Sequence, residues 1–151
     1  MIKGLHNFLE TIPIFAGLND AALTELAGAL EENEFSEGTV IVREGESGNR
    51  MFIIHTGRVE VVKRIGQTGE VILAIFGPKN FLGEMCIIEC VARAASLRAA
   101  EDCSLFSLRG TDLHRLFKHQ PDQYAIVILN IARDLCRRLR ALDETFTAIS
   151  H

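Results

Sequence analysis

The sequence has no long apolar run, and nothing at its N-terminus resembles a targeting segment. Its longest apolar stretch, residues 124–131, is interrupted by Asn130 and is too short to span a bilayer. Residues 1–7 contain no apolar region of the kind found in a signal peptide. We therefore expect a cytoplasmic protein without a membrane span.

Cysteine is also scarce. The four cysteines, Cys86, Cys90, Cys103 and Cys136, are too few and too scattered for a disulfide-stabilised fold in a chain of 151 residues. Cys86 and Cys90 are one helical turn apart, but there is no Cys-x-x-Cys motif and no pair of histidines nearby. Free cysteines usually lie buried as small apolar groups. We therefore predict no metal site.

Motifs for catalysis and for nucleic-acid binding are absent as well. The five histidines include no pair one residue apart, as a cupin-type metal enzyme needs, and His55 is interpreted as a satisfied core or surface residue. There is no Gly-x-Ser-x-Gly elbow and no phosphate loop ending in Lys-Ser/Thr. The formal net charge of −4 gives no overall attraction to nucleic acid. We predict that the protein is not an enzyme.

What the sequence does contain fits one domain over residues 1–151. Apolar spacing in residues 1–34 predicts two helices, one over residues 2–10 and a second capped by Asn19 or Asp20. From 35 to 110, short β-branched runs between glycines are typical of a β-barrel or sandwich. The predicted strands are 39–43, 51–55, 58–63, 70–76, 96–100 and 103–108, with a turn at Gly57 and a hairpin loop at 66–69.

Residues 111–151 are predicted to form two helices. Thr111 is expected to cap a short helix over 112–118, with Leu113, Leu116 and Phe117 facing inward, and Pro121 suits the first turn of a long helix. Along that helix a heptad stripe is formed by Ile128, Ala132, Leu135, Leu139, Leu142, Phe146 and Ile149. The stripe either packs on the protein's own barrel or, as its narrow width favours, forms a homodimer with a second copy.

Arginines in the same helix do not indicate nucleic-acid binding. Arg133, Arg137, Arg138 and Arg140 alternate with acidic residues, which is typical of a solvated helix face. Because the sequence stops at His151, we expect no DNA-binding domain after this helix.

The most informative stretch is residues 81–96, which has the parts of a site for a phosphate joined to a sugar. Gly83 lets the backbone approach a ligand, and the free amides of a predicted helix over 84–89 favour an anion. Arg93 offers a fork of donors to two phosphate oxygens, while Ala94 and Ala95 leave their backbone amides accessible. Glu84 would repel a phosphate and is better suited to a sugar hydroxyl.

Two runs within this stretch, Gly83-Glu84-Met85 and Arg93-Ala94-Ala95-Ser96, resemble in residues and spacing the phosphate-binding cassette of the cyclic nucleotide-binding domain family. The family includes the bacterial catabolite activator proteins and the regulatory subunits of cyclic-AMP-dependent protein kinase. Residues 45–59 resemble the family's glycine-flanked strand framework. The chain departs from the family pattern at Ala92, where a proline is usual, and at Leu82, but neither change removes a ligand contact.

The resemblance implies a mainly β fold, an eight-stranded jelly roll with flanking helices. It also implies that Glu84 binds the ribose 2′-hydroxyl and that Arg93 binds the cyclic phosphate. Ligand-binding residues would then be Gly83, Glu84, Met85, Arg93, Ala94, Ala95 and Ser96. Family members that bind cGMP have a threonine directly after the arginine, so Ala94 favours cAMP. The expected function is a cyclic nucleotide sensor that signals to an effector protein, and forms a homodimer, through its last helix.

Several alternatives stay open at this point. An isolated Glu84–Arg93 pair would more simply be a surface ion pair. The chain could be a relative that binds no nucleotide and acts as a scaffold or senses another effector. It could also be a piece of a channel, kinase regulator or transcription factor, or a haem or redox sensor.

Overall fold

The computed structural model describes residues 4–88 and 91–150, and for residues 85–86 and 146–150 it describes the backbone alone. This part of the chain divides into two compact units. One comprises the N-terminal helices and the C-terminal helices, and the other comprises residues 28–114, which hold the strands. The division does not test the prediction of a single domain, which stays a prediction.

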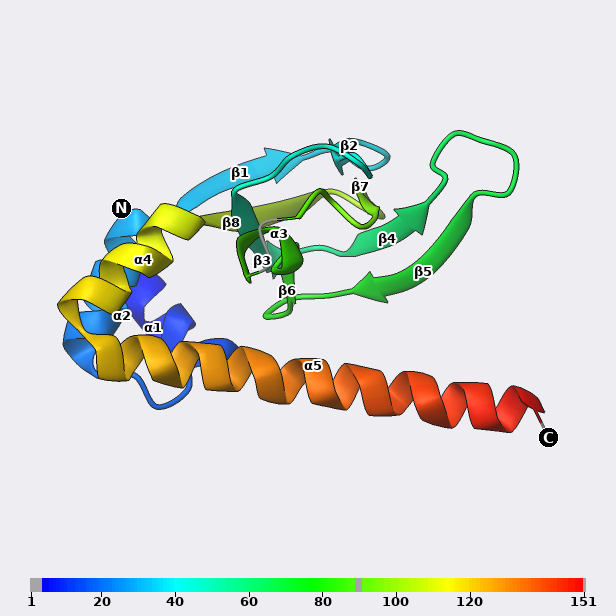
Figure 1. Cartoon of the computed structure of the whole chain (residues 1–151). Coiled ribbons are helices and arrows are strands. Elements are labelled where there is room, and N and C mark those ends of the chain that lie inside the picture. Colours follow the sequence, from blue (N-terminus) through cyan, green and yellow to red (C-terminus); the bar gives the residue numbers. More distant parts are fainter. Residues whose placement is uncertain (1–3, 89–90, 151) are drawn as a thin grey trace. The chain divides into compact units, whose positions relative to one another are not determined.

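The strand unit contains eight strands in two four-stranded antiparallel sheets (Figure 1). In one sheet the spatial order is β1 (Glu31–Phe35), β8 (Cys103–Arg109), β3 (Arg50–Thr56) and β6 (Phe81–Leu82). In the other sheet the order is β2 (Val40–Val42), β7 (Ser96–Ala99), β4 (Val59–Lys63) and β5 (Val71–Phe76). The predicted eight-stranded jelly roll with flanking helices is thus confirmed.

The core of this unit is built by side chains from both sheets, as the alternation of in-facing and out-facing residues along a strand requires. Phe52 and Ile54 from β3 meet Val59 from β4 and Leu97 from β7 in one buried cluster. The turn between β3 and β4 lies at Gly57, where φ is +82° and an added Cβ would stand 2.4 Å from the Asp102 carbonyl oxygen. Gly57 is therefore required for this turn, as predicted.

The expectation that residues 1–34 contain only helices is wrong for residues 31–34, which belong to strand β1. Its sequence is too polar to read as a strand, but it pairs with β8 along its whole length. Glu32 accepts hydrogen bonds from Ser104 (2.6 Å) and from His55 Nδ1 (2.5 Å), which lie on β8 and β3. Partial burial opposes the effect, but these hydrogen bonds hold the pKa of Glu32 below its usual value. Tertiary hydrogen bonding has overridden weak strand propensity here.

The β4–β5 hairpin extends from its sheet, with the predicted loop around residues 66–69 at its tip (Figure 1). β5 is an edge strand, and Leu73 is an extra residue in the pairing, because Val61 pairs with Ala74 while Val62 pairs with Ile72. Arg98 on β7 fixes the hairpin by bonding Glu60 (2.5 Å) and both carboxylate oxygens of Glu70 (3.1 and 3.2 Å).

The helical unit contains α1 (Leu5–Glu10), a 3-10 turn η1 (Pro13–Phe15), α2 (Asp20–Ala29, whose last residues lie in the strand unit) and α5 (Pro121–Ser150). Asn19 caps α2 by accepting a hydrogen bond from Ala22 N–H (2.8 Å), as predicted. Asn130 of α5 donates to the carbonyl oxygens of Ile14 (3.1 Å) and Ala16 (2.9 Å), so α5 is tied to the η1 segment.

Helix α4 (Gly110–His119) precedes α5, and two predictions about it, the cap and the position of Phe117, are wrong. Thr111 lies inside the helix rather than capping it, and the N–H of Arg109 donates to Asp112 (2.8 Å) at its start. Leu113 and Leu116 are buried as expected, but Phe117 is 48% exposed and contacts Tyr124 edge to face.

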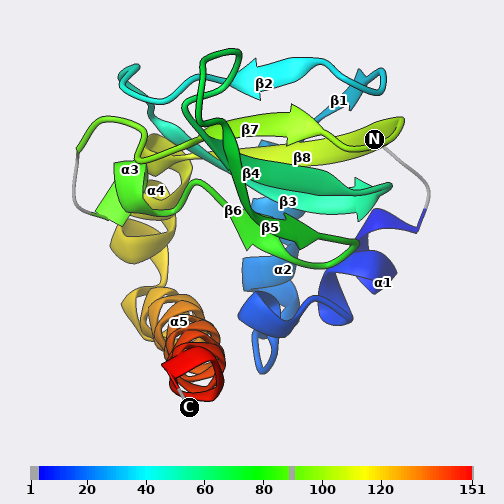
Figure 2. The same cartoon turned by 90° about the vertical axis from the view of Figure 1, so that its right-hand side faces the viewer.

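The long helix α5 is continuous from Pro121 and is seen nearly end-on in Figure 2. Its buried face is formed by Gln123, Val127 and Ile131, four residues apart, and not by the predicted heptad stripe. Leu139 and Leu142 of that stripe are 60% and 65% exposed. The side chains of Phe146 and Ile149 lie outside the described residues. No helix in the described residues combines the length and the apolar character needed to cross a membrane.

Candidate functional site

The candidate site begins where β6 ends. Gly83 has φ of +79°, which an L-residue with a Cβ adopts only with strain, and the chain then enters the one-turn helix α3 (Met85–Ile88). The N–H groups of Ile87 and Ile88 donate to the Glu84 carbonyl oxygen. The helix is shorter than the predicted 84–89, and Glu89 lies outside the described residues. Because α3 is only one turn long, it can offer individual backbone N–H donors to an anion but has only a weak helix dipole.

The backbone at Arg93 is held by a loop that is distant in sequence. Arg93 N–H donates to the Glu46 carbonyl oxygen, and Gly45 N–H donates to the Arg93 carbonyl oxygen, both at 2.8 Å. These two bonds tie the end of the cassette to the loop before β3, so the direction of the Arg93 side chain is fixed by main-chain pairing.

The guanidinium of Arg93 lies in a narrow slot made by two glycines and an aromatic ring. An added Cβ on Gly48 would stand 2.4–2.6 Å from Nε, Cζ and Nη2, and one on Gly83 would stand 2.6 Å from Nη1. The carbon Cζ is 5.6 Å from the centre of the Phe52 ring, within cation–π distance. Nη1 also donates a long hydrogen bond (3.5 Å) to the Gly83 carbonyl oxygen. We call this arrangement of Gly48, Phe52, Gly83 and Arg93 the arginine slot.

Arg93 is only 6% exposed, and within residues 4–88 and 91–150 it forms no ion pair. A buried cation without a carboxylate partner is expensive unless an anion compensates it. Glu84 is also buried, at 8% exposure. The alternative of a surface ion pair between Glu84 and Arg93 is therefore wrong, because neither residue is at the surface.

The remaining predicted site residues follow Arg93 into β7. Ala94 is exposed and Ala95 is half-buried, whereas Ser96 is fully buried. The Ser96 hydroxyl accepts a hydrogen bond from Glu44 N–H (2.9 Å), so its proton remains for a further acceptor. The side chain of Met85 lies outside the described residues. The structure thus brings Gly83 beside Arg93, ten residues later, and places Ser96 against the loop before β3 that also holds the Arg93 backbone.

Glu44 connects Ser96 to the β4–β5 hairpin. Its carboxylate accepts hydrogen bonds from Arg64 N–H and Lys63 Nζ, both at 3.2 Å. These two donors, the Arg64 amide first, hold the pKa of Glu44 below its usual value. The loop before β3 therefore contacts both ends of the site, through Arg93 and through Ser96.

Two residues of the arginine slot, Gly48 and Phe52, were not among the predicted site residues. The sequence showed Gly48 only as one of several turn glycines, and Phe52 as one apolar residue of a strand. A hollow of about 370 Å³ also borders Gly48, lined further by Ile87, Val91 and Thr111 among others. Arg93 does not line it, so the hollow adjoins the arginine slot at Gly48 without containing the guanidinium.

Comparison with known families gives one model match. The model described as "Cyclic nucleotide-binding domain" matches residues 32–120, which include every strand except the first residue of β1 and the whole predicted site.

Two curated relatives illustrate the range of proteins in which this sequence pattern occurs. A cyclic nucleotide-gated potassium channel of Rhizobium etli is 38% identical over 114 residues, covering 76% of this chain and 30% of the channel. A CRP-like cAMP-activated global transcriptional regulator of Mycobacterium tuberculosis is 29% identical over 140 residues, covering 93% of this chain and 61% of the regulator. The chain thus spans only about a third to three fifths of these relatives.

Solved structures share the fold. A cyclic nucleotide-binding domain from Methylobacillus flagellatus matches with a TM-score of 0.80 at 23% identity, covering 92% of this chain and 78% of that one. The regulatory subunit of a cAMP-independent protein kinase A from Trypanosoma brucei matches with a TM-score of 0.73 at 29% identity, covering 85% and 44%.

Proposed function

The chain belongs to the cyclic nucleotide-binding domain family, and we propose that it is a sensor whose arginine slot binds the phosphate of a cyclic nucleotide. One observation supports an anionic ligand of this kind, the buried guanidinium of Arg93 with no carboxylate partner among the described residues. Such a group is preorganised for a monoanion, because the slot already holds it in place before the ligand arrives.

Five of the seven predicted residues have a direct chemical role in this proposal. Arg93 binds two oxygens of the cyclic phosphate, and the backbone amides of Ala94 and Ala95 bind the same group. The buried carboxylate of Glu84 accepts a hydrogen bond from the ribose 2′-hydroxyl, and the proton of Ser96 is available to a phosphate oxygen. In this proposal the carboxylate of Glu84 binds the sugar and the guanidinium of Arg93 binds the phosphate.

We favour cAMP over cGMP as the ligand. In the family, a threonine directly after the arginine bonds the guanine amino group, and here that position is Ala94, whose methyl group cannot do so. The protein would act as a cytoplasmic regulatory module, with no catalytic step of its own.

Helix α5 is the proposed route by which occupancy reaches a partner. A ligand can shift this helix only if it binds one arrangement of the protein more tightly than another. The exposed Leu139 and Leu142 support a homodimer in which α5 meets its counterpart in a second copy. Spin labels at one exposed α5 position in each of two associated copies should report a changed distance distribution between the copies on saturation with cAMP. An unchanged distribution would refute the transmission step while leaving binding intact.

Calorimetric titration with cAMP and cGMP tests the binding itself. Arg93→Ala and Glu84→Ala should each weaken cAMP binding by about 1–3 kcal/mol or more, roughly 5- to 150-fold, because each removes a charge-assisted hydrogen bond. Arg58→Ala is the matched control, since Arg58 is a 58%-exposed arginine paired with Glu101 (3.4 Å) on the surface. No heat at millimolar cAMP or cGMP would contradict the proposal.

A second candidate is a family member that senses a different anion. The Trypanosoma brucei structure, described as cAMP-independent, supports this alternative because it shares the fold at 29% identity. Calorimetric titration with other anionic metabolites, alongside cAMP and cGMP, separates the two candidates. The second candidate would be favoured if the protein binds another anion, if Arg93→Ala abolishes that binding, and if neither cyclic nucleotide binds.

A further inference from the structure

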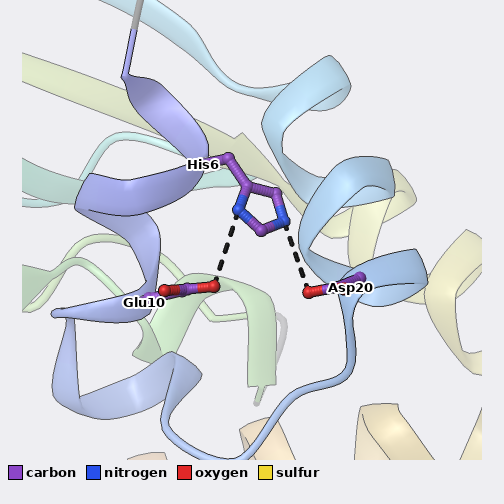
Figure 3. Close-up of side chains that lie close together, drawn as sticks. All are labelled: His6, Glu10 and Asp20. Atoms are coloured by element: carbon purple, nitrogen blue, oxygen red, sulfur yellow. Dashed lines mark ion pairs between the residues drawn. The ribbon is translucent and has the colours of Figure 1, made fainter.

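The helical unit contains a cluster of three metal-ligating side chains that is distinct in residues from the arginine slot. His6 and Glu10 lie one turn apart on α1, and Asp20 is the first residue of α2 (Figure 3). One ligand atom from each of the three residues lies within 4.8 Å of the others. We propose that this cluster binds a divalent transition-metal ion such as Zn²⁺ or Mn²⁺.

The imidazole is oriented for such an ion. Nε2 of His6 faces Asp20 Oδ1 at 3.8 Å, and Nδ1 faces Glu10 Oε1 at 3.6 Å (Figure 3). Two ligands that each lie about 2.1 Å from one ion are roughly 3–4 Å apart, so Nε2 and Asp20 Oδ1 have the spacing of a coordinating pair. Metal-bound histidines usually donate their other ring N–H to a carboxylate. Glu10 is placed to accept that hydrogen bond, which makes it the group that orients the imidazole.

No other interaction in residues 4–88 and 91–150 occupies these groups. Both separations are within ion-pair range but longer than a hydrogen bond, so the imidazole contacts the two carboxylates without hydrogen bonding to either. The task of capping α2 falls to Asn19, which leaves the carboxylate of Asp20 in solvent at 92% exposure. The carboxylates of Glu10 and Asp20 give the cluster two negative charges, which attract a cation.

The donor set determines the class of ion. An imidazole together with a carboxylate suits Zn²⁺ and Mn²⁺, whereas Ca²⁺ and Mg²⁺ prefer oxygen ligands alone. Because the side chains of Glu10 and Asp20 are exposed, water would complete the coordination. A bound ion would link α1 to the start of α2 across the intervening η1 turn.

Calorimetric titration of the full chain with Zn²⁺ tests the site. We expect saturable binding of one ion that His6→Ala abolishes and that Asp20→Asn weakens at least about tenfold. Glu10→Gln should weaken it about 10- to 100-fold, the effect typical of a group that orients a ligand. Asp20→Asn disturbs no packing, because that side chain is almost fully exposed.

The matched control is His119→Ala. His119 Nδ1 forms a hydrogen-bonded pair with Glu25 Oε1 at 2.9 Å, an imidazole–carboxylate pair outside the three-residue cluster. This variant should leave Zn²⁺ binding unchanged. Binding that is identical in wild type and His6→Ala would instead arise from the thiols or other groups, and would overturn the proposal.

Paramagnetic line broadening by Mn²⁺ locates the ion independently. Amide signals of residues 5–11 and 19–21 should broaden first in the wild-type protein and remain sharp in Asp20→Asn. Broadening that begins elsewhere, or that is the same in both proteins, contradicts the site. Because neither readout involves a cyclic nucleotide, failure of this proposal and failure of the proposed function are distinguished.

Discussion

Two arginines that are five residues apart have opposite surroundings. Arg93 lies in a slot of two glycines and an aromatic ring, with no carboxylate partner among the described residues. Arg98, on β7, bonds Glu60 and Glu70 on the β4–β5 hairpin. The two glutamates, Glu70 first, raise the pKa of Arg98 above its already high value. Arg98 is thus paired with two acids, whereas Arg93 is held by neutral groups, which is the arrangement that the proposed anion site needs.

Replacing each arginine in turn should give the largest contrast. Arg98→Ala should lower the free energy of unfolding by about 1–2 kcal/mol, because it leaves the poorly exposed carboxylate of Glu60 without its partner. Arg93→Ala should lower it by less than Arg98→Ala does, since no ion pair is lost and a buried cation without a carboxylate partner is removed. Urea unfolding of both variants, with cAMP titrations of each, measures the contrast. If Arg93→Ala destabilises the fold as much as Arg98→Ala does, Arg93 is a structural residue.

Gly48→Ala should weaken cAMP binding moderately while leaving the stability of the fold almost unchanged. The new Cβ would displace only the flexible end of Arg93, and Gly48 has no positive φ, so folding is little affected. The guanidinium would leave its position, and cAMP affinity should fall about fivefold, roughly 1 kcal/mol.

Gly77→Ala is the control for this change, because its added Cβ would meet Arg58 at an ordinary 3.9 Å. Calorimetry of cAMP binding to the two variants is the measurement. An equal loss of affinity in both would show that the slot around Arg93 has no special role.

The smallest expected effect is the change with pH in the stability that Glu70 contributes. Hydrogen bonds from Arg98, and then from Gly66 N–H, hold the pKa of Glu70 below its usual value of 4.5 in the folded protein. The stabilisation from this carboxylate is therefore fully present at neutral pH and is lost as the pH falls below about 4.5, through the folded pKa.

Urea unfolding between pH 6 and pH 3 checks this dependence. Glu70→Gln should be less stable than wild type at pH 6, and the difference should shrink as the pH falls. Glu32 and Glu44 titrate in both proteins, so only the difference between the two curves reports Glu70. A difference that stays constant over this range would contradict the assignment.

Much of the fold followed from local patterns. Six strands were predicted to within a residue or two, and Gly57, Asn19 and Pro121 were assigned correctly because turns and caps depend on nearby backbone geometry. Strands β1 and β6 were missed. β1 is stabilised by pairing with β8, about seventy residues later in the chain, and β6 is only two residues long. Phe117 was placed inward because helical spacing alone does not say which other segments cover a face.

The sequence alone determined which residue types stand at the cassette: a glycine that adopts positive φ, an acid beside it, and an arginine nine residues after that acid. Such features are local, because backbone conformation and side-chain chemistry belong to the residue itself. Only the tertiary structure placed Gly48 and Phe52 against Arg93, and His6 beside Asp20. Those contacts join segments that come together only when the chain packs, and no periodicity along the sequence encodes them.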